Sequence, residues 1–209
     1  MPTSAVRTIV AGVAVADAED ATLLDAAALA VQTGATLHLV HAFDPPAMGA
    51  LLPDLHSVYL HEGDGREARL RKRLREAAAL VAPGVTFSVW VFAGSPGDAI
   101  LEVARKVGAD LVVVGASHHG ALGRAVMGTA AERVVRGSPA PVLVLREPFL
   151  RPLRRVLLTT DLSGLSAGVH EKGLDLLGAL FAGDSPELRS LAVVAAGLVP
   201  PPLPRETLM

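Results

Sequence analysis

Short apolar segments rich in β-branched residues alternate along this chain with longer amphipathic segments. The apolar segments have the length of strands and the amphipathic segments have the length of helices. Strands that alternate with helices pair in parallel through right-handed crossovers and are buried on both faces. The sequence therefore predicts an α/β fold, with a five-stranded parallel sheet and helices on both faces.

The limits of these elements follow from the apolar runs and from the residues that start and stop helices. The expected strands are Ile9–Val15, Thr36–Ala42, Val85–Phe92, Leu111–Val114 and Pro141–Leu145. The expected helices are Asp20–Thr33, Gly65–Val81, Ser95–Lys106 and Thr129–Arg136. Ser95 is expected to cap its helix, with Pro96 in the first turn and Asp98 returning the cap. Three prolines predict a long loop over residues 44–63, with room for a short helical turn.

The composition fits a protein with a large aliphatic core. Of the 209 residues, 51% are apolar, 19% are charged and 3% are aromatic. The formal net charge of −2 provides no field that attracts nucleic acid or an anionic membrane. The absence of cysteine excludes disulfides. With no segment typical of a secretory signal or a membrane span, we expect a cytoplasmic protein with no nucleic-acid or membrane partner.

The last part of the chain repeats the pattern of its beginning. A strand over residues 155–160, a helix His170–Phe181 and a strand Leu188–Val194 reproduce the opening strand, helix and strand. Self-similarity of this kind is typical of duplication. The sequence therefore predicts two domains, residues 1–148 and a truncated second copy over residues 153–209 that forms a partial βαβ repeat.

The loop from Gly115 to Thr129 has a composition that suits a phosphate group. Its glycines allow backbone N–H groups to approach an anion, and Thr129 adds a hydroxyl at the start of a helix. The loop is not a Walker A motif, because Ala121-Leu122 stands where Lys-Ser/Thr is required. No Gly-x-Gly-x-x-Gly follows the first strand, so the common dinucleotide fingerprint is also absent.

The residues around this loop resemble a known family. The segments 109–115, 132–135 and 138–144, together with Gly128-Thr129, are similar to the C-terminal half of a universal stress protein domain. Gly94-Ser95-Pro96 and Ile100 also match that family, and the resemblance extends over residues 5–147. It implies a Rossmann-like fold of the adenine nucleotide alpha hydrolase-like type, a role in the stress response, and ATP as a ligand.

The resemblance also implies which residues would hold the nucleotide. The adenosine side would be formed by Val13, Ala14, Ala42, Val114 and Gly115, and the phosphate side by His118, Gly128, Thr129 and Ala130. His118 replaces the family's middle glycine. Ala14 stands where ATP-binding members carry an aspartate, and Asp17 lies three positions later. Asp161 occupies the matching position in the second copy, which has no phosphate loop.

Other functional groups give weaker signals. The histidines have no recognised metal-ligand spacing, and no catalytic serine motif occurs. The basic run over residues 66–75 spreads around its helix without aromatic partners, as a solvated face does. Members of this family typically dimerise through their last strand. The resemblance therefore implies a homodimer through Val142–Leu145, unless the second copy covers that strand. The alternatives to an ATP-binding module are a member that acts through protein contacts alone and a slow ATP hydrolase.

Overall fold

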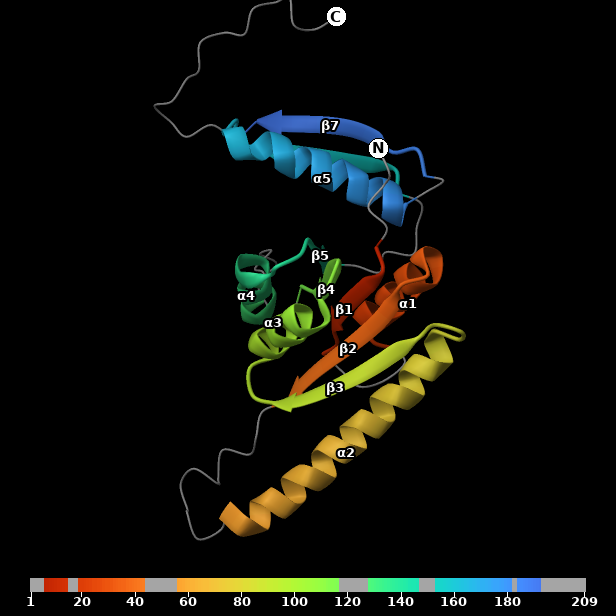
Figure 1. Cartoon of the computed structure of the whole chain (residues 1–209), viewed down its shortest axis with the longest axis vertical. Coiled ribbons are helices and arrows are strands. Elements are labelled where there is room, and N and C mark those ends of the chain that lie inside the picture. The colour runs from red at the N-terminus through yellow and green to blue at the C-terminus, as the bar shows by residue number, and fades with distance from the viewer. Residues whose placement is uncertain are drawn as a thin grey trace, which may run out of the picture. The chain divides into compact units, whose positions relative to one another are not determined.

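The computed structural model describes residues 6–14, 19–43, 56–116, 128–146, 153–181 and 184–192, without the side chains of residues 56–64 and 165–167 (Figure 1). These residues fall into two compact units, one within residues 5–150 and one within residues 151–209. His118, Asp17 and most of the predicted phosphate loop lie outside the described residues.

The first unit has the predicted alternation of strands and helices. Its elements in chain order are β1 (Thr8–Gly12), α1 (Ala21–Thr33), β2 (Thr36–Phe43), α2 (His56–Val81), β3 (Phe87–Ala93), α3 (Pro96–Val107), β4 (Leu111–Gly115), α4 (Thr129–Gly137) and β5 (Val142–Leu145). The strands form one sheet in the order β3-β2-β1-β4-β5, and every pairing is parallel. The predicted fold class is confirmed.

The helices cover both faces of this sheet (Figure 1). The chain moves from β1 toward β3 in one direction and from β1 through β4 to β5 in the other. Because parallel crossovers are right-handed, this reversal places α1 and α2 on one face and α3 and α4 on the other. α1 packs on β1, β2, β4 and α2, whereas α3 packs on β1, β2 and α4.

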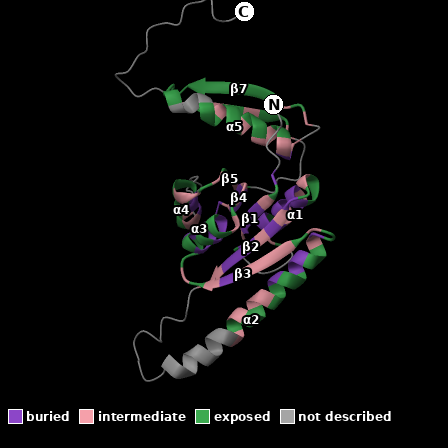
Figure 2. Ribbon diagram, in the orientation of Figure 1, coloured by how far each residue is buried: buried purple, intermediate pink, exposed green. Residues whose placement is uncertain are grey.

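The core is aliphatic, as the composition predicts. Ile9, Leu37 and Leu111 are fully buried on the face covered by α1. Val10 and Val112 are fully buried on the face covered by α3. Buried residues are concentrated in the central strands and in the sides of the helices that face them (Figure 2). Burial on both faces explains why these strands read as continuous apolar runs rather than as alternating patterns.

Glycine 12 in β1 is required by packing. A Cβ atom at this position would lie 2.4 Å from Cδ1 and 3.2 Å from Cγ1 of Ile100 in α3. Ile100 is itself buried in the cluster that α3 forms on the sheet. The absence of a side chain on β1 thus allows α3 to lie close to the strand.

Several helix ends agree with the predicted caps. Asp20 caps α1 by accepting the N–H of Leu23, and Gly34 ends the helix in the left-handed region at φ 70°. Ser95 caps α3 by accepting the N–H of Asp98, and Gly108 ends it at φ 61°. The carboxylate of Asp98, however, does not return the cap as predicted, because it pairs with Arg133 of α4.

Three predicted limits are wrong. α2 begins at His56, so helix occupies residues 56–63 that the sequence assigned to a loop. An interior glycine costs a helix only about 1 kcal/mol, and neither Gly63 nor Gly65 ends it. β3 begins at Phe87 rather than Val85, because the N–H of Val85 closes a turn onto the carbonyl of Ala82. β1 ends at Gly12 rather than Val15, which lies outside the described residues.

The second unit is a single parallel βαβ unit. It consists of β6 (Arg155–Thr160), α5 (Gly164–Leu180) and β7 (Glu187–Ala192), with β6 and β7 paired in parallel. α5 begins six residues before the predicted His170, capped at Ser163. Every residue of β7 is exposed, and Leu180 is the most buried large side chain of the unit (Figure 2). The origin of this unit as a truncated second copy stays a prediction.

Within the described ranges, no helix combines the length and the apolar character that a bilayer span requires.

A polar cluster joins the middle of β2 to the edge strand β3. Trp90 donates its indole N–H to Oγ of Ser88 at 3.0 Å, and Nδ1 of His38 lies 2.7 Å from the same oxygen. Since Trp90 can only donate, the Ser88 hydroxyl is available to donate to Nδ1 of a neutral His38. The ammonium of Lys106 lies 4.9 Å from the centre of the Trp90 ring. Burial lowers the pKa of His38 from its ordinary value of 6.5.

This cluster predicts an acid-sensitive fluorescence signal. Because the pKa of His38 is lower in the folded state than in the unfolded state, its contribution to stability is complete above pH ~6.5 and is lost as the pH falls toward the folded pKa. Protonation also removes the acceptor for Ser88 beside the chain's one tryptophan. We therefore expect Trp90 emission to titrate with a midpoint below pH ~6.5. His38→Asn keeps an acceptor that cannot titrate, and an unchanged titration in this variant would contradict the assignment.

Candidate functional site

The candidate site lies at the carboxyl edge of the sheet, between β1 and β4. These two strands are adjacent, and the chain leaves them toward opposite sides of the sheet. In parallel α/β sheets such a reversal opens a crevice in which ligands bind. Gly12 is in register with Val114. The residues that follow, Val13 and Ala14 after β1 and Gly115 at the end of β4, therefore lie at the mouth of this crevice.

The peptide group between Val13 and Ala14 is held by two side chains. Its carbonyl oxygen accepts a hydrogen bond from Nδ1 of His41 at 2.9 Å. Its N–H donates to Oδ2 of Asp20 at 3.2 Å. His41 comes from β2 and Asp20 from the N-terminus of α1, so both elements fix the orientation of this peptide. The exit of β1 is consequently fixed by contacts within the protein.

The pairing of β1 with β2 continues one residue beyond the end of the strand. The N–H of Val13 donates to the carbonyl of Val40 at 2.8 Å. Val13 is therefore held by the backbone of β2 as well as by the side chain of His41.

His41 is a functional group that the sequence analysis did not identify. Its side chain is buried, with 7% of its surface exposed, rather than lying at an exposed strand end. Because a carbonyl oxygen can only accept, Nδ1 of His41 carries the proton of this hydrogen bond. The sequence could have indicated that His41 is buried, because His41 lies on the same face of β2 as the buried Leu37 and Leu39.

Gly115 makes a close contact with the first turn of α1. A Cβ atom at position 115 would lie 2.8 Å from Oγ1 of Thr22, a buried residue two positions after Asp20. The backbone of Gly115 does not have a positive φ. Its lack of a side chain therefore serves the approach of α1 to β4.

The start of α4 forms the other part of the candidate site. Gly128 caps the helix in an extended conformation, with φ −61° and ψ 150°, and Thr129 and Ala130 are its first residues. Gly128 supplies no side-chain cap, so the first amides of α4 are not capped in the usual way. Such amides and the helix dipole together favour an anion.

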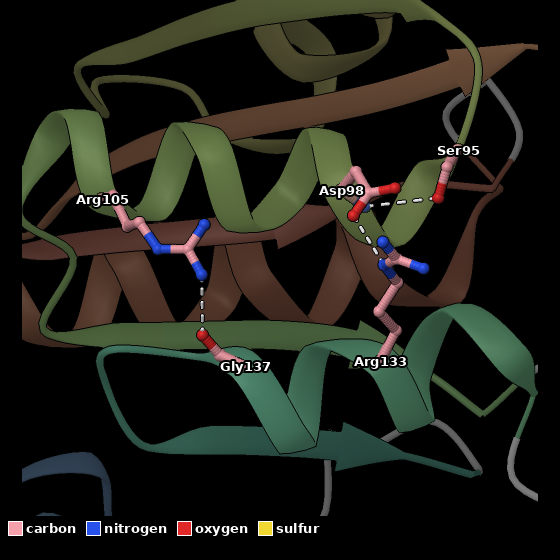
Figure 3. A network of polar contacts seen from close by, with 5 residues as sticks. All are labelled: Ser95, Asp98, Arg105, Arg133 and Gly137. Carbon is pink, nitrogen blue, oxygen red and sulfur yellow. Dashed lines mark hydrogen bonds and ion pairs between the residues drawn. The ribbon is translucent and has the colours of Figure 1, made fainter.

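α4 is held in place by its packing on α3 (Figure 3). Arg133 of α4 pairs with Asp98 in the first turn of α3, and Arg105 donates to the carbonyl of Gly137 at 3.1 Å. The helices approach closely because a Cβ atom on Gly97 would lie 3.0 Å from Cδ of Arg133. The Asp98–Arg133 pair links the first turn of α3 to α4, and the bond from Arg105 to Gly137 links the ends of the two helices.

Some of the predicted site residues lie at the carboxyl edge of the sheet, and others pack in the core. Val13, Ala14 and Gly115 lie together at the crevice, and Gly128, Thr129 and Ala130 lie at the start of α4. The side chains of Val114 and Ala42 pack in the core on the α3 face, so they present backbone rather than side chains at the sheet edge. Among the described residues, His, Asp and Glu side chains do not gather in threes as a metal ion would require.

Comparison with known proteins assigns this fold and loop to a family. Residues 5–146 match the Universal stress protein family. The chain belongs to the universal stress protein family. The match spans the whole first unit, including the sheet edge and the start of α4.

One curated protein and two solved structures illustrate what this chain is similar to. A universal stress protein from Thermus aquaticus is 34% identical over 119 residues, which cover 54% of this chain and 79% of that protein. A putative universal stress protein from Pseudomonas aeruginosa has a TM-score of 0.59 at 21% identity, covering 92% of this chain and 63% of the other. A universal stress protein crystallised with cAMP has a TM-score of 0.48 at 25% identity, covering 68% of this chain and 98% of that chain.

The contact between Gly115 and Thr22 predicts a compensated pair of substitutions in this universal stress protein. Gly115→Ala places a methyl group against a β-branched side chain in a helix, and we expect it to destabilise the protein by about 1–3 kcal/mol. Adding Thr22→Ala removes the clashing hydroxyl, so the double variant should regain most of that loss. Urea unfolding of the two single variants and the double variant measures the coupling. Additive losses would show that the two residues do not interact.

Proposed function

We propose that this universal stress protein is a cytoplasmic, homodimeric binding module that holds ATP at the carboxyl edge of its sheet. The observation that carries the proposal is that two features lie at the carboxyl edge of the sheet: the exit of β1, whose peptide is held by His41 and Asp20, and the start of α4, which Gly128 leaves without a side-chain cap. Membership in the family adds support, because the matched region includes both parts.

The two parts suit different portions of a nucleotide. We assign the nucleoside to the exits of β1, β2 and β4, where Val13, Ala14, Ala42, Val114 and Gly115 lie. The first amides of α4 and the hydroxyl of Thr129 suit the phosphates, because anions are stabilised at a helix N-terminus. His118 stays a predicted contact on the phosphate side. We propose no catalytic residue, so hydrolysis of ATP would be slow.

A proline at the first position of α4 tests the phosphate side. Gly128 already has the extended conformation that a residue before proline adopts, and proline is well tolerated at the first helical position. Thr129→Pro therefore preserves the helix and removes one N–H and one hydroxyl. We expect it to weaken ATP binding in calorimetry by about tenfold or more, which corresponds to about 1.4 kcal/mol.

Thr129→Ser is the matched control, since it retains both the N–H and the hydroxyl and should bind ATP as the wild type does. If the wild type gives no binding heat with millimolar ATP, the nucleotide proposal is wrong and the protein acts through protein contacts. Rapid release of phosphate from bound ATP would instead identify an ATP hydrolase.

The proposed dimer uses the free side of β5. β5 lies at one edge of the sheet. The N–H of Val112 donates to the carbonyl of Pro141, and the N–H of Ala116 donates to the carbonyl of Leu145. Residues 141, 143 and 145 thus face β4, and Val144 directs its N–H and C=O to the free side. An edge with unpaired backbone groups is a natural surface for pairing with a second copy.

A proline on this edge tests the dimer. Val144→Pro removes one outward N–H without removing a bond to β4. We expect the mass in solution, measured by light scattering, to fall from that of two chains to that of one. Val89→Pro is the control, because residue 89 faces outward on the opposite edge strand β3, where the N–H of Leu37 meets the carbonyl of Thr86. Equal masses for both variants would rule out dimerisation through β5.

A further inference from the structure

We propose that Ser88 is an acyl-acceptor site, a serine that His38 activates to take an acyl group from a thioester or an aryl ester. The inference does not rest on ATP binding. His38 is the third residue of β2 and Ser88 the second residue of β3, so the pair lies near the amino edge of the sheet, away from the edge used in the proposed function. The residues that carry the inference all belong to described elements and are Ser88, His38, Trp90 and Lys106.

The hydroxyl of Ser88 lies where a serine nucleophile needs its base. Its Oγ is 2.7 Å from Nδ1 of His38, within the ~2.6–3.2 Å that separates a nucleophile from its base in covalent catalysis. The two residues are in register on paired strands, so the sheet itself fixes their separation. Such a pair is recognised by its geometry and not by a sequence motif. This explains why the sequence analysis found no catalytic serine.

The indole of Trp90 determines the direction of the hydrogen bond between Ser88 and His38. Its N–H can only donate, and it lies 3.0 Å from Oγ of Ser88 and 3.5 Å from Nδ1 of His38. Nδ1 is therefore an acceptor, and the Ser88 hydroxyl donates to it. Burial lowers the pKa of His38, which favours the neutral base. In this arrangement the imidazole can take the hydroxyl proton when the oxygen attacks an electrophile.

Two groups favour the negative charge that Ser88 acquires as it loses its proton. The Trp90 N–H donates to Oγ, and this hydrogen bond strengthens when the oxygen becomes negative. The ammonium of Lys106 lies 4.9 Å from the centre of the Trp90 ring, so a positive charge stands beside the same side chains. An opposite charge nearby favours an ionised form. Ser88 and His38 are each half-buried, so the pair also meets the solvent from which a donor would come.

The proposed step transfers one acyl group and needs no further reactant. Oγ of Ser88 bonds to the carbonyl carbon of the donor, and the hydroxyl proton passes to Nδ1 of His38. The bond from that carbon to the sulfur or oxygen of the leaving group then breaks. The leaving group takes the bonding electrons and the proton from His38, which becomes neutral again. A good leaving group is required, because the described contacts give Ser88 one N–H donor and not the paired donors of an oxyanion hole.

The test treats the full-length protein with p-nitrophenyl acetate and maps acetylated residues over time by mass spectrometry. Ser138 is the matched internal control, because it is half-buried like Ser88 but donates its hydroxyl to the carbonyl of Ala140 at 2.7 Å rather than to a base. We expect Ser88 to be acetylated about a hundredfold faster than Ser138, which is the size of a general-base effect.

Two variants test the base. His38→Asn keeps an acceptor for Ser88 but cannot take up its proton, so acetylation of Ser88 should slow about a hundredfold. His170→Asn is the matched control, because Nε2 of His170 also bonds to a strand, at 2.8 Å from the carbonyl of Thr159. It should leave the rate at Ser88 unchanged. Circular dichroism and urea unfolding establish that each variant is folded under the conditions of the test.

Three results would overturn the inference. Equal acetylation of Ser88 and Ser138 in the wild type would show that Ser88 is not activated, and this comparison needs no variant. Equal rates at Ser88 in the wild type and in folded His38→Asn would show that His38 is not its base. A stable acetyl group on His38 instead of Ser88 would make the imidazole the nucleophile. Each of these results would leave the proposed function standing.

Discussion

The pairing of β1 with β2 on one side and with β4 on the other determines the arrangement of the whole carboxyl edge. Gly12 is in register with both Val40 and Val114. The reversal of the chain at β1 sends the connections of β1 and β4 to opposite faces of the sheet. The starts of α1 and α4 thereby approach one crevice from opposite faces, although they are separated by more than half of the first unit's sequence.

Some glycines in this protein allow an unusual backbone conformation, and others allow two elements to pack closely. Gly34 and Gly108 occupy the left-handed region at helix ends, where their conformation was predictable. Gly12 and Gly115 have no such conformation and are instead required by side chains from other elements, Ile100 and Thr22. The sequence analysis explained Gly115 by its approach to an anion. The structure supplies a second reason, which holds whether or not a ligand binds.

The sequence predicted the elements better than their connections. The strands of the first unit were located to within a few residues, because burial on both faces gives an uninterrupted apolar run. The early start of α2 was missed, since three prolines predict a loop over residues 44–63 but the last of them, Pro53, precedes the helix in the sequence. α5 also starts earlier than predicted, and its interior glycines cost the helix only about 1 kcal/mol each. Asp20 was recognised as a helix start, but its bond to Ala14 depends on tertiary packing. The role of His41 depends in the same way on the neighbouring strand.

Ile100 occupies the space that a side chain on residue 12 would fill, and this has a consequence for how the sequence can diverge. A larger residue at position 12 would lift the first turns of α3 away from the sheet. Because Gly97 leaves little room beneath Arg133, the start of α4 would be displaced together with them. The position of the start of α4 therefore depends on residue 12, which lies on a different strand. A substitution at this residue would change the candidate site although residue 12 itself makes no contact there.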